Sequence, residues 1–358
     1  MWNRRARTGA LLAGALLLAA CDDATGPDPT ETFDAEAALA DYQALEEILQ
    51  SSAFAGFQSL DGRTPFSGAA SMGLVDAFAE ADSREFAVEL LTRARRSMDT
   101  RGVEGAPLIS EGNRGSTFVY DPATDDYVLD PEREGAPATG VRFILYEVDG
   151  SGTPIVGEEI GHADLVDEGD TSSEQIALHL TAVANGRTHL DYRTTLDGSD
   201  GEGALTVAGF VQGDGEARLD FDVQVAGEVV DGRDQVDLDF DLDVASRDFE
   251  IDGRVRGIGE DEAGEIDVTV RHGTDSFQLL ASVANQTIDG SIRLNGELFA
   301  TASGPADDPT FTNANGLALS GIEILVLVAI ADSVEDVFDL VEDLIDPVDN
   351  LVILGALL

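Results

Sequence analysis

Carboxylates recur at every second position in two neighbouring stretches of the sequence, and the pairing of these stretches decides what chemistry they can do. A loop of two or four residues inside 245–248 pairs Val244 with Phe249 and keeps the apolar residues of both strands on one face. The same register sets acidic residues opposite one another on the other face, in two pairs: Asp241 with Asp252, and Asp243 with Glu250.

These four carboxylates are candidates for a cation site. Hard cations such as Ca²⁺ prefer clustered carboxylate oxygens, whereas like charges directly opposite each other destabilise a sheet. Two other interpretations stay open: the charges repel and are screened by salt, or Arg271 reaches Asp252 from the next strand. The register pairs the neighbouring acids with arginines, Asp239 with Arg254 and Asp237 with Arg256.

A second candidate site combines two of the four histidines with an aspartate. A three-residue loop at 184–186 pairs His179 with Asp191, and Thr181 with His189. Two imidazoles and one carboxylate are a ligand set for a transition metal. The alternative is an exposed His–Asp pair without a metal.

Catalytic motifs are missing from the sequence. There is no Gly-x-Ser-x-Gly elbow, phosphate-binding loop or His-Glu-x-x-His motif. The chain has no lysine for a Schiff base, and Cys21 is its only cysteine. Seventy acidic residues make any glycosidase-like carboxylate pair uninformative. We therefore expect a protein that is not an enzyme and has no cofactor, apart from the possible Ca²⁺.

The elements that carry these residues follow from hydrophobic periodicity. Apolar residues alternate with polar ones from about 116 to 303, which predicts antiparallel strands with one apolar and one wet face. Helical spacing occurs before this region, within about 33–100, and after it, at about 321–346. The predicted fold class is α+β: a large, curved antiparallel meander, half-barrel-like, with N- and C-terminal helices packed on its apolar face. The stretch 141–148 is largely apolar on both faces, so we expect that strand to be covered on both sides.

The charge of the chain restricts its partners. The 21 basic residues oppose 70 acidic ones, for a net charge of −49. Nucleic acid binding needs a basic footprint and is not expected. Apolar residues make up 43%, which is enough for a sizeable core.

The first twenty residues have the zones of an export signal. Three arginines precede an apolar run that ends in Leu18-Ala19-Ala20-Cys21. This ending resembles the lipobox of bacterial lipoproteins, which implies cleavage before Cys21, acylation of that cysteine and attachment to a membrane. Cleavage leaves 18 arginines, so the mature net charge is 18 − 70 = −52. We expect a signal peptide at 1–20, an acylated tether at 21–32 and a single domain at 33–358.

The layout of a curved sheet with helices is similar to that of the Lol lipoprotein carriers, although no motif matches residue by residue. That resemblance implies an apolar cavity for a lipid or other apolar ligand. Two functions therefore stay open, both for a non-catalytic lipoprotein of the cell envelope on the periplasmic or cell-surface side. The first encloses such a ligand between sheet and helices. The second is a structural or interaction protein with an acidic, cation-binding outer face and no cavity.

Overall fold

The computed structural model describes most of the central part of the chain. The described residues are 44–45, 47–60, 63, 109–169, 176–199, 202–215, 217–230, 233–258, 263–305, 309–321, 323–324 and 327. They include one 15-stranded sheet, the helix α2 (Ser52–Gln58) and the 3-10 turn η3 (Ala245–Arg247). Residues 44, 45, 47–49, 321, 323, 324 and 327 are also helical. The strands are β1 (Ser116–Asp121), β2 (Asp126–Leu129), β3 (Gly140–Val148), β4 (Pro154–Asp167), β5 (Ile176–Ala184), β6 (Arg187–Ser199), β7 (Glu202–Gln212), β8 (Arg218–Val230), β9 (Arg233–Val244), β10 (Phe249–Ile258), β11 (Ala263–His272), β12 (Asp275–Ala284), β13 (Thr287–Leu294), β14 (Glu297–Pro305) and β15 (Thr310–Asn313).

The predicted α+β class was wrong, because the structure is mostly β. An open sheet of fifteen strands makes up most of the described part, and α2 is a helix of only seven residues. Of the predicted helical regions, the helical residues Leu45, Ile48 and Leu49 are buried in the core and Leu327 packs against it. The alternating pattern also continues past residue 303, since β15 adds a strand at Thr310–Asn313. The helical patterns at 72–96 and 322–345 lie outside the described residues, apart from 323, 324 and 327, which are helical.

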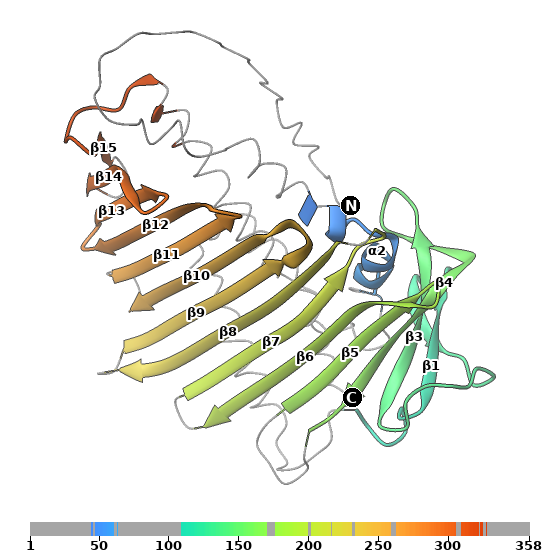
Figure 1. Cartoon of the computed structure of the whole chain (residues 1–358). Helices are drawn as coiled ribbons and strands as arrows, with labels where there is room; N and C mark the ends of the chain where they lie inside the picture. The colour runs from blue at the N-terminus through green and yellow to red at the C-terminus, as the bar shows by residue number, and fades with distance from the viewer. Residues whose placement is uncertain are drawn as a thin grey trace.

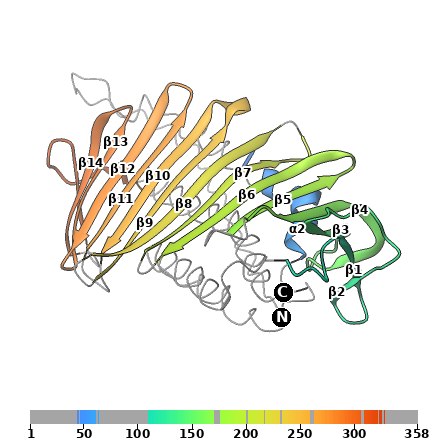
Figure 2. The same cartoon turned by 90° about the horizontal axis from the view of Figure 1, so that it is seen from below.

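The strands follow one another in space almost as they do in sequence. The order is β15-β14-β13-β12-β11-β10-β9-β8-β7-β6-β5-β4-β3-β1-β2, and the colours of Figure 1 run across the sheet accordingly. Every neighbouring pair is antiparallel except β1 and β3, which run parallel. Figure 2 shows β2 at one end of this meander. Local hairpins therefore build nearly the whole sheet.

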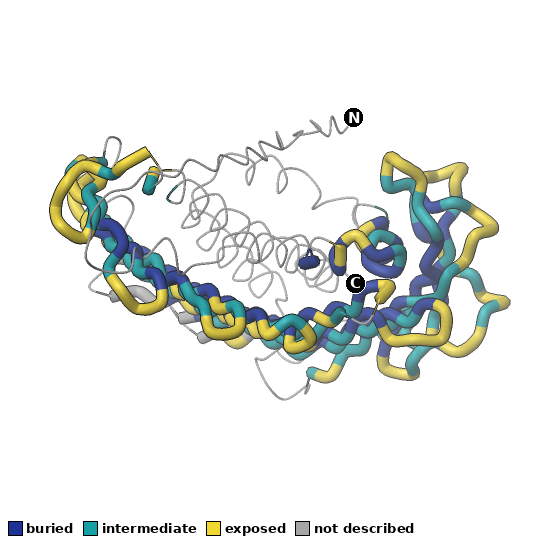
Figure 3. The backbone as a smooth tube through the Cα atoms, turned by 45° about the horizontal axis from the view of Figure 1, so that its top comes forward, coloured by how far each residue is buried: buried dark blue, intermediate teal, exposed yellow. Residues whose placement is uncertain are grey.

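The sheet is curved, and its two faces differ in polarity. Figure 3 shows it as an arc, with exposed residues at the strand ends and turns. Alternate residues of the central strands are buried, as in Leu238, Phe240 and Leu242 of β9. The residues between them are aspartates that are exposed or half-buried. The predicted two-faced alternation is confirmed.

The predicted covering of β3 on both sides is also confirmed, because its four consecutive residues 143–146 are buried.

The helix α2 lies on the concave side of the sheet and contacts β3, β4, β5 and β6 (Figures 1 and 3). Its N-cap Ser51 accepts a hydrogen bond from the Phe54 N–H through its hydroxyl, which satisfies a free donor of the first turn. Phe54 and Phe57 are buried against the sheet. A Cβ on Gly56 would lie 2.9 Å from the Tyr146 carbonyl oxygen, so glycine allows this close approach. No helix among the described residues is long and apolar enough to cross a membrane.

Candidate functional site

The loop between β9 and β10 fixes the position of the acidic residues. It has four residues, Ala245–Asp248, of which the first three form η3. Asp248 has φ +54°, a left-handed conformation that aspartate adopts more readily than most residues. The loop pairs Val244 with Phe249, so the register predicted from the sequence is confirmed. Asp241 lies opposite Asp252, and Asp243 opposite Glu250.

A third strand contributes to this face. β8 pairs with β9 so that Asp220 lies opposite Asp243, and Asp222 opposite Asp241. Two rows of carboxylates therefore cross three strands. The outer row comprises Asp220, Asp243 and Glu250, and the inner row comprises Asp222, Asp241 and Asp252. We call these six residues the acidic rows.

Sequence reasoning missed the contribution of β8. The Asp231-Gly232 dipeptide between β8 and β9 is a signal for a two-residue hairpin loop. A two-residue loop pairs Val230 with Arg233 and leads to the register that the structure has. The signal was therefore present in the sequence.

Arginines compensate part of this face. Arg254 Nε lies 2.5 Å from Asp239 Oδ1, and Arg256 Nε lies 2.7 Å from Asp237 Oδ1, so both predicted ion pairs are confirmed. At the edges of the acidic rows, arginines from the same face bind single acids or pairs of acids. Arg218 contacts Asp220, and Arg271 of β11 contacts both Glu250 and Asp252.

The centre of the acidic rows has no such partner. Among the described residues, no arginine contacts Asp222, Asp241 or Asp243, although Asp222 accepts a hydrogen bond from Gln224. The uncompensated charge is therefore concentrated where β9 meets its two neighbours. Repulsion between opposite carboxylates follows from this arrangement.

Partial burial and this repulsion together raise the pKa of the central acids. The pKa of Asp241 is raised to about 6, first by partial removal of its carboxylate from water, then by its hydrogen bond and charge interaction with Asp252. The pKa of Asp243 is also raised, by partial desolvation and then by the charge of Asp220. Both causes favour the protonated form of Asp241 above the usual pH range of an aspartate.

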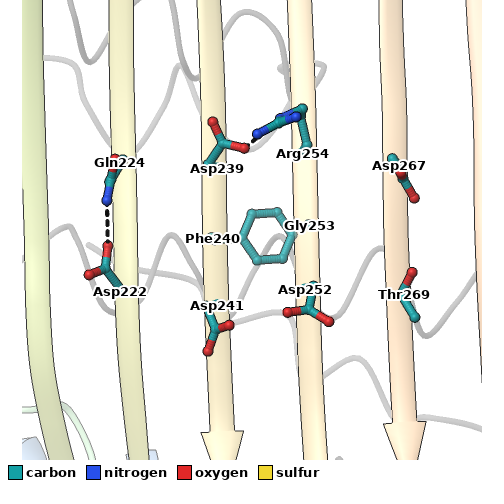
Figure 4. Close-up of a pocket in the computed structure, with 10 residues that line it drawn as sticks. All are labelled: Asp222, Gln224, Asp239, Phe240, Asp241, Asp252, Gly253, Arg254, Asp267 and Thr269. Carbon is teal, nitrogen blue, oxygen red and sulfur yellow. Dashed lines mark hydrogen bonds and ion pairs between the residues drawn. The ribbon is translucent and has the colours of Figure 1, made fainter.

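A hollow of about 650 Å³ opens over this part of the face (Figure 4). Five of its ten lining residues are aspartates, and the cross-strand pair Phe240 and Gly253 also lines it. The lining residues are Asp222, Gln224, Asp239, Phe240, Asp241, Asp252, Gly253, Arg254, Asp267 and Thr269. Oxygens of Asp241, Glu250 and Asp252 lie within 4.8 Å of one another, close enough to share one cation. Asp243, the fourth candidate, is outside that group of three.

The predicted histidine site is not assembled. β5 and β6 are joined by the two-residue turn Asn185-Gly186, and a bulge opposite Ala182 and Val183 makes His189 the extra residue. His179 therefore lies opposite Arg193, and Thr181 opposite Asp191, so the partner of each residue is two positions further along β6 than predicted. The predicted three-residue loop at 184–186 was wrong because the bulge supplies the odd residue.

The histidines find separate partners. His179 Nε2 lies 2.8 Å from Asp191 Oδ1, and its Nδ1 lies 3.3 Å from Glu168 Oε1. His189 is buried, and its Nδ1 donates to the Gln212 carbonyl oxygen at 2.9 Å. The two nitrogens of His179 face two different carboxylates, so His179, His189 and Asp191 do not converge on one point.

The acidic rows can attract cations. Cys21, the predicted lipid attachment residue, lies outside the described residues. No family model matches the chain, and comparisons with curated proteins and with solved structures give no match either.

Proposed function

We propose that the protein is a non-catalytic lipoprotein of the cell envelope, held on a membrane by lipid at Cys21, whose acidic outer sheet face takes up cations. The proposal of cation uptake rests on the acidic rows, in which three adjacent strands present carboxylates on the same face of the sheet. Among the described side chains on this face of β8 to β11, ten are acids and four are arginines, a net charge of −6. Such a surface concentrates cations.

The position of the hollow favours this function over the carriage of a lipid. The hollow lies on the acidic face, and five of its lining residues are aspartates. An acyl chain gains free energy from apolar contact, which these carboxylates do not provide. The apolar-ligand function has no comparable observation in its support.

The anchor is tested by Cys21→Ser. We expect the variant to be released from the membrane fraction, because acyl chains supply the attachment and the strongly negative chain does not adsorb to anionic lipid by itself. Membrane fractionation and the mass of the N-terminal peptide measure this. An unmodified Cys21 in the wild-type protein would contradict the proposal.

The cation site is tested by thermal melts with and without Ca²⁺ at fixed ionic strength. We expect Ca²⁺ to raise the melting temperature beyond the effect of matched NaCl, since a ligand bound only by the folded state stabilises it. The double variant Asp241→Asn/Asp252→Asn should lose this additional rise.

The matched control is Asp237→Asn/Asp239→Asn, which removes two charges from the same face at positions paired with Arg256 and Arg254. This control should keep the response to Ca²⁺. An equal response in both double variants would reduce the face to a screened surface charge and remove the cation site from the proposal.

A further inference from the structure

The strand β2 forms one edge of the sheet, and its free side is partly occupied by the chain itself. Antiparallel pairing with β1 alternates between hydrogen-bonded and non-hydrogen-bonded pairs. The bond from the Asp130 N–H to the Thr117 carbonyl makes that pair hydrogen-bonded, so the backbone groups of Tyr127 and Leu129 point away from β1. There, the Tyr127 N–H donates to the carbonyl oxygen of Arg63.

The side chain of Arg63 holds its backbone in this position. Its Nε lies 2.9 Å from Asp125 Oδ1, in the turn between β1 and β2. Its Nη1 donates to the carbonyl of Ser59, the C-cap residue of α2, and to the Gly152 carbonyl in the loop between β3 and β4, both at 3.2 Å. Asp125 also accepts a hydrogen bond from the Tyr120 hydroxyl at 2.8 Å. One guanidinium therefore connects α2, the β1–β2 turn and the β3–β4 loop.

The edge that Arg63 covers is suited to pairing with another strand. Val128 is 36% exposed and Leu129 is 53% exposed, so apolar side chains reach solvent on both faces of β2. Edge strands normally avoid association through charge, shortness or a covering segment. The opposite edge also has a covering segment, because Ala318 bridges Thr312 and the Asn313 N–H donates to the Leu317 carbonyl at 2.8 Å.

We propose that Arg63 is an edge guard, and that its loss opens β2 to antiparallel pairing with β2 of a second copy of this chain. Two identical edges that pair antiparallel are related by a two-fold axis, which closes the assembly as a dimer. The backbone groups of Tyr127 and Leu129 supply hydrogen bonds, and the exposed Val128 and Leu129 supply apolar contact. The high negative charge opposes association, so salt should promote it.

The test compares Arg63→Ala with Arg133→Ala in the chain without its signal peptide, with Cys21→Ser to remove the lipid. Arg133 is a matched control, because its side chain also forms ion pairs with acids, Glu159 and Asp130. Sedimentation velocity over a series of concentrations, in low and in high NaCl, reports the mass. We expect the mass of Arg63→Ala to rise towards twice the monomer value with concentration and salt, while wild type and Arg133→Ala stay monomeric.

Two further variants keep the result interpretable. Arg63→Ala/Leu129→Lys places a charge on the edge and should return the protein to a monomer. Asp125→Asn weakens the hold on Arg63 without removing it, and should associate to an intermediate degree if Arg63→Ala fails to fold by circular dichroism. A folded Arg63→Ala that remains monomeric at every salt concentration would overturn the proposal, as would association that Leu129→Lys leaves unchanged.

Discussion

Replacing Phe240 with alanine should lower the free energy of unfolding by about 3–5 kcal/mol, the usual cost of removing a buried phenylalanine side chain. Phe240 is 4% exposed and lies opposite Gly253, a position without a side chain of its own. Its ring fills the space beside that glycine, as Figure 4 shows. Chemical denaturation at constant pH and salt measures the loss.

A double-mutant cycle separates this contact from simple loss of apolar surface. A Cβ on Gly253 would lie 1.9 Å from Phe240 Cζ, so Gly253→Ala alone should also be destabilising. In the Phe240→Ala background, the methyl group added by Gly253→Ala meets no ring and fills part of the cavity. The destabilisation caused by Gly253→Ala should therefore vanish or change sign. Residues in contact show interaction energies of about 0.5–3 kcal/mol in such cycles.

The control cycle pairs Gly253→Ala with Phe249→Ala. Phe249 is also buried on β10, but it lies opposite Val244, and four residues of strand place it about 13 Å from Gly253. The two changes should therefore add. Additivity of Phe240→Ala with Gly253→Ala would show that the ring does not cover the glycine.

Asparagine at position 241 should make the protein more stable than wild type at pH 7.5, and no more stable at pH 4. The pKa of Asp241 is about 6 in the folded chain, against an ordinary value of 3.8. A raised folded pKa means that ionisation favours the unfolded state, so stability is lost as the pH rises from about 4 to about 6 and stays lost above. Because Asp241 is exposed, solvent screening limits the effect to about 1 kcal/mol.

The control for this prediction is Asp239→Asn, two residues away on the same face. Asp239 forms an ion pair with Arg254, so its loss should be neutral or slightly destabilising at pH 7.5. Thermal melts across pH 4–8 compare the three proteins. High salt should reduce the gain from Asp241→Asn, since exposed charges are screened beyond about 10 Å at 0.1 M salt. A gain that is the same at pH 4 would rule out repulsion as its cause.

The sequence predicted the acidic pairs because two independent constraints agree on one register. Strand alternation fixes which residues share a face, and the even loop at Ala245–Asp248 keeps Val244 and Phe249 on the same one. The same argument failed at β5 and β6. The apolar residues of these two strands share a face only if one additional residue lies in the loop or in a bulge. The prediction put it in the loop, whereas the structure puts it in a bulge at His189. Asn185-Gly186 was the available signal, because this dipeptide favours a two-residue turn.

The fold class was predicted wrongly for a different reason. Helical spacing in a local stretch predicts a helix there, but the class depends on the balance of elements over the whole chain. Fifteen strands outweigh α2 and η3 in the part of the chain that the structure describes. A contact of Arg271 with Asp252 was one of the interpretations left open, because choosing it needs the register of β11 as well as that of β9. The structure contains that contact and adds one with Glu250.

The near-sequential order of the strands has a consequence for how the molecule folds and comes apart. In the described sheet, each strand from β4 to β15 pairs only with the strands just before and after it in the chain. Stability in such an array is close to a sum of nearest-neighbour terms, as in repeat proteins, and folding can start at any hairpin and spread. Unfolding should therefore begin at the two ends and move inward, with amide exchange fastest in β15 and β2 and slowest near β8 and β9. A single melting temperature would then average over strands of unequal stability.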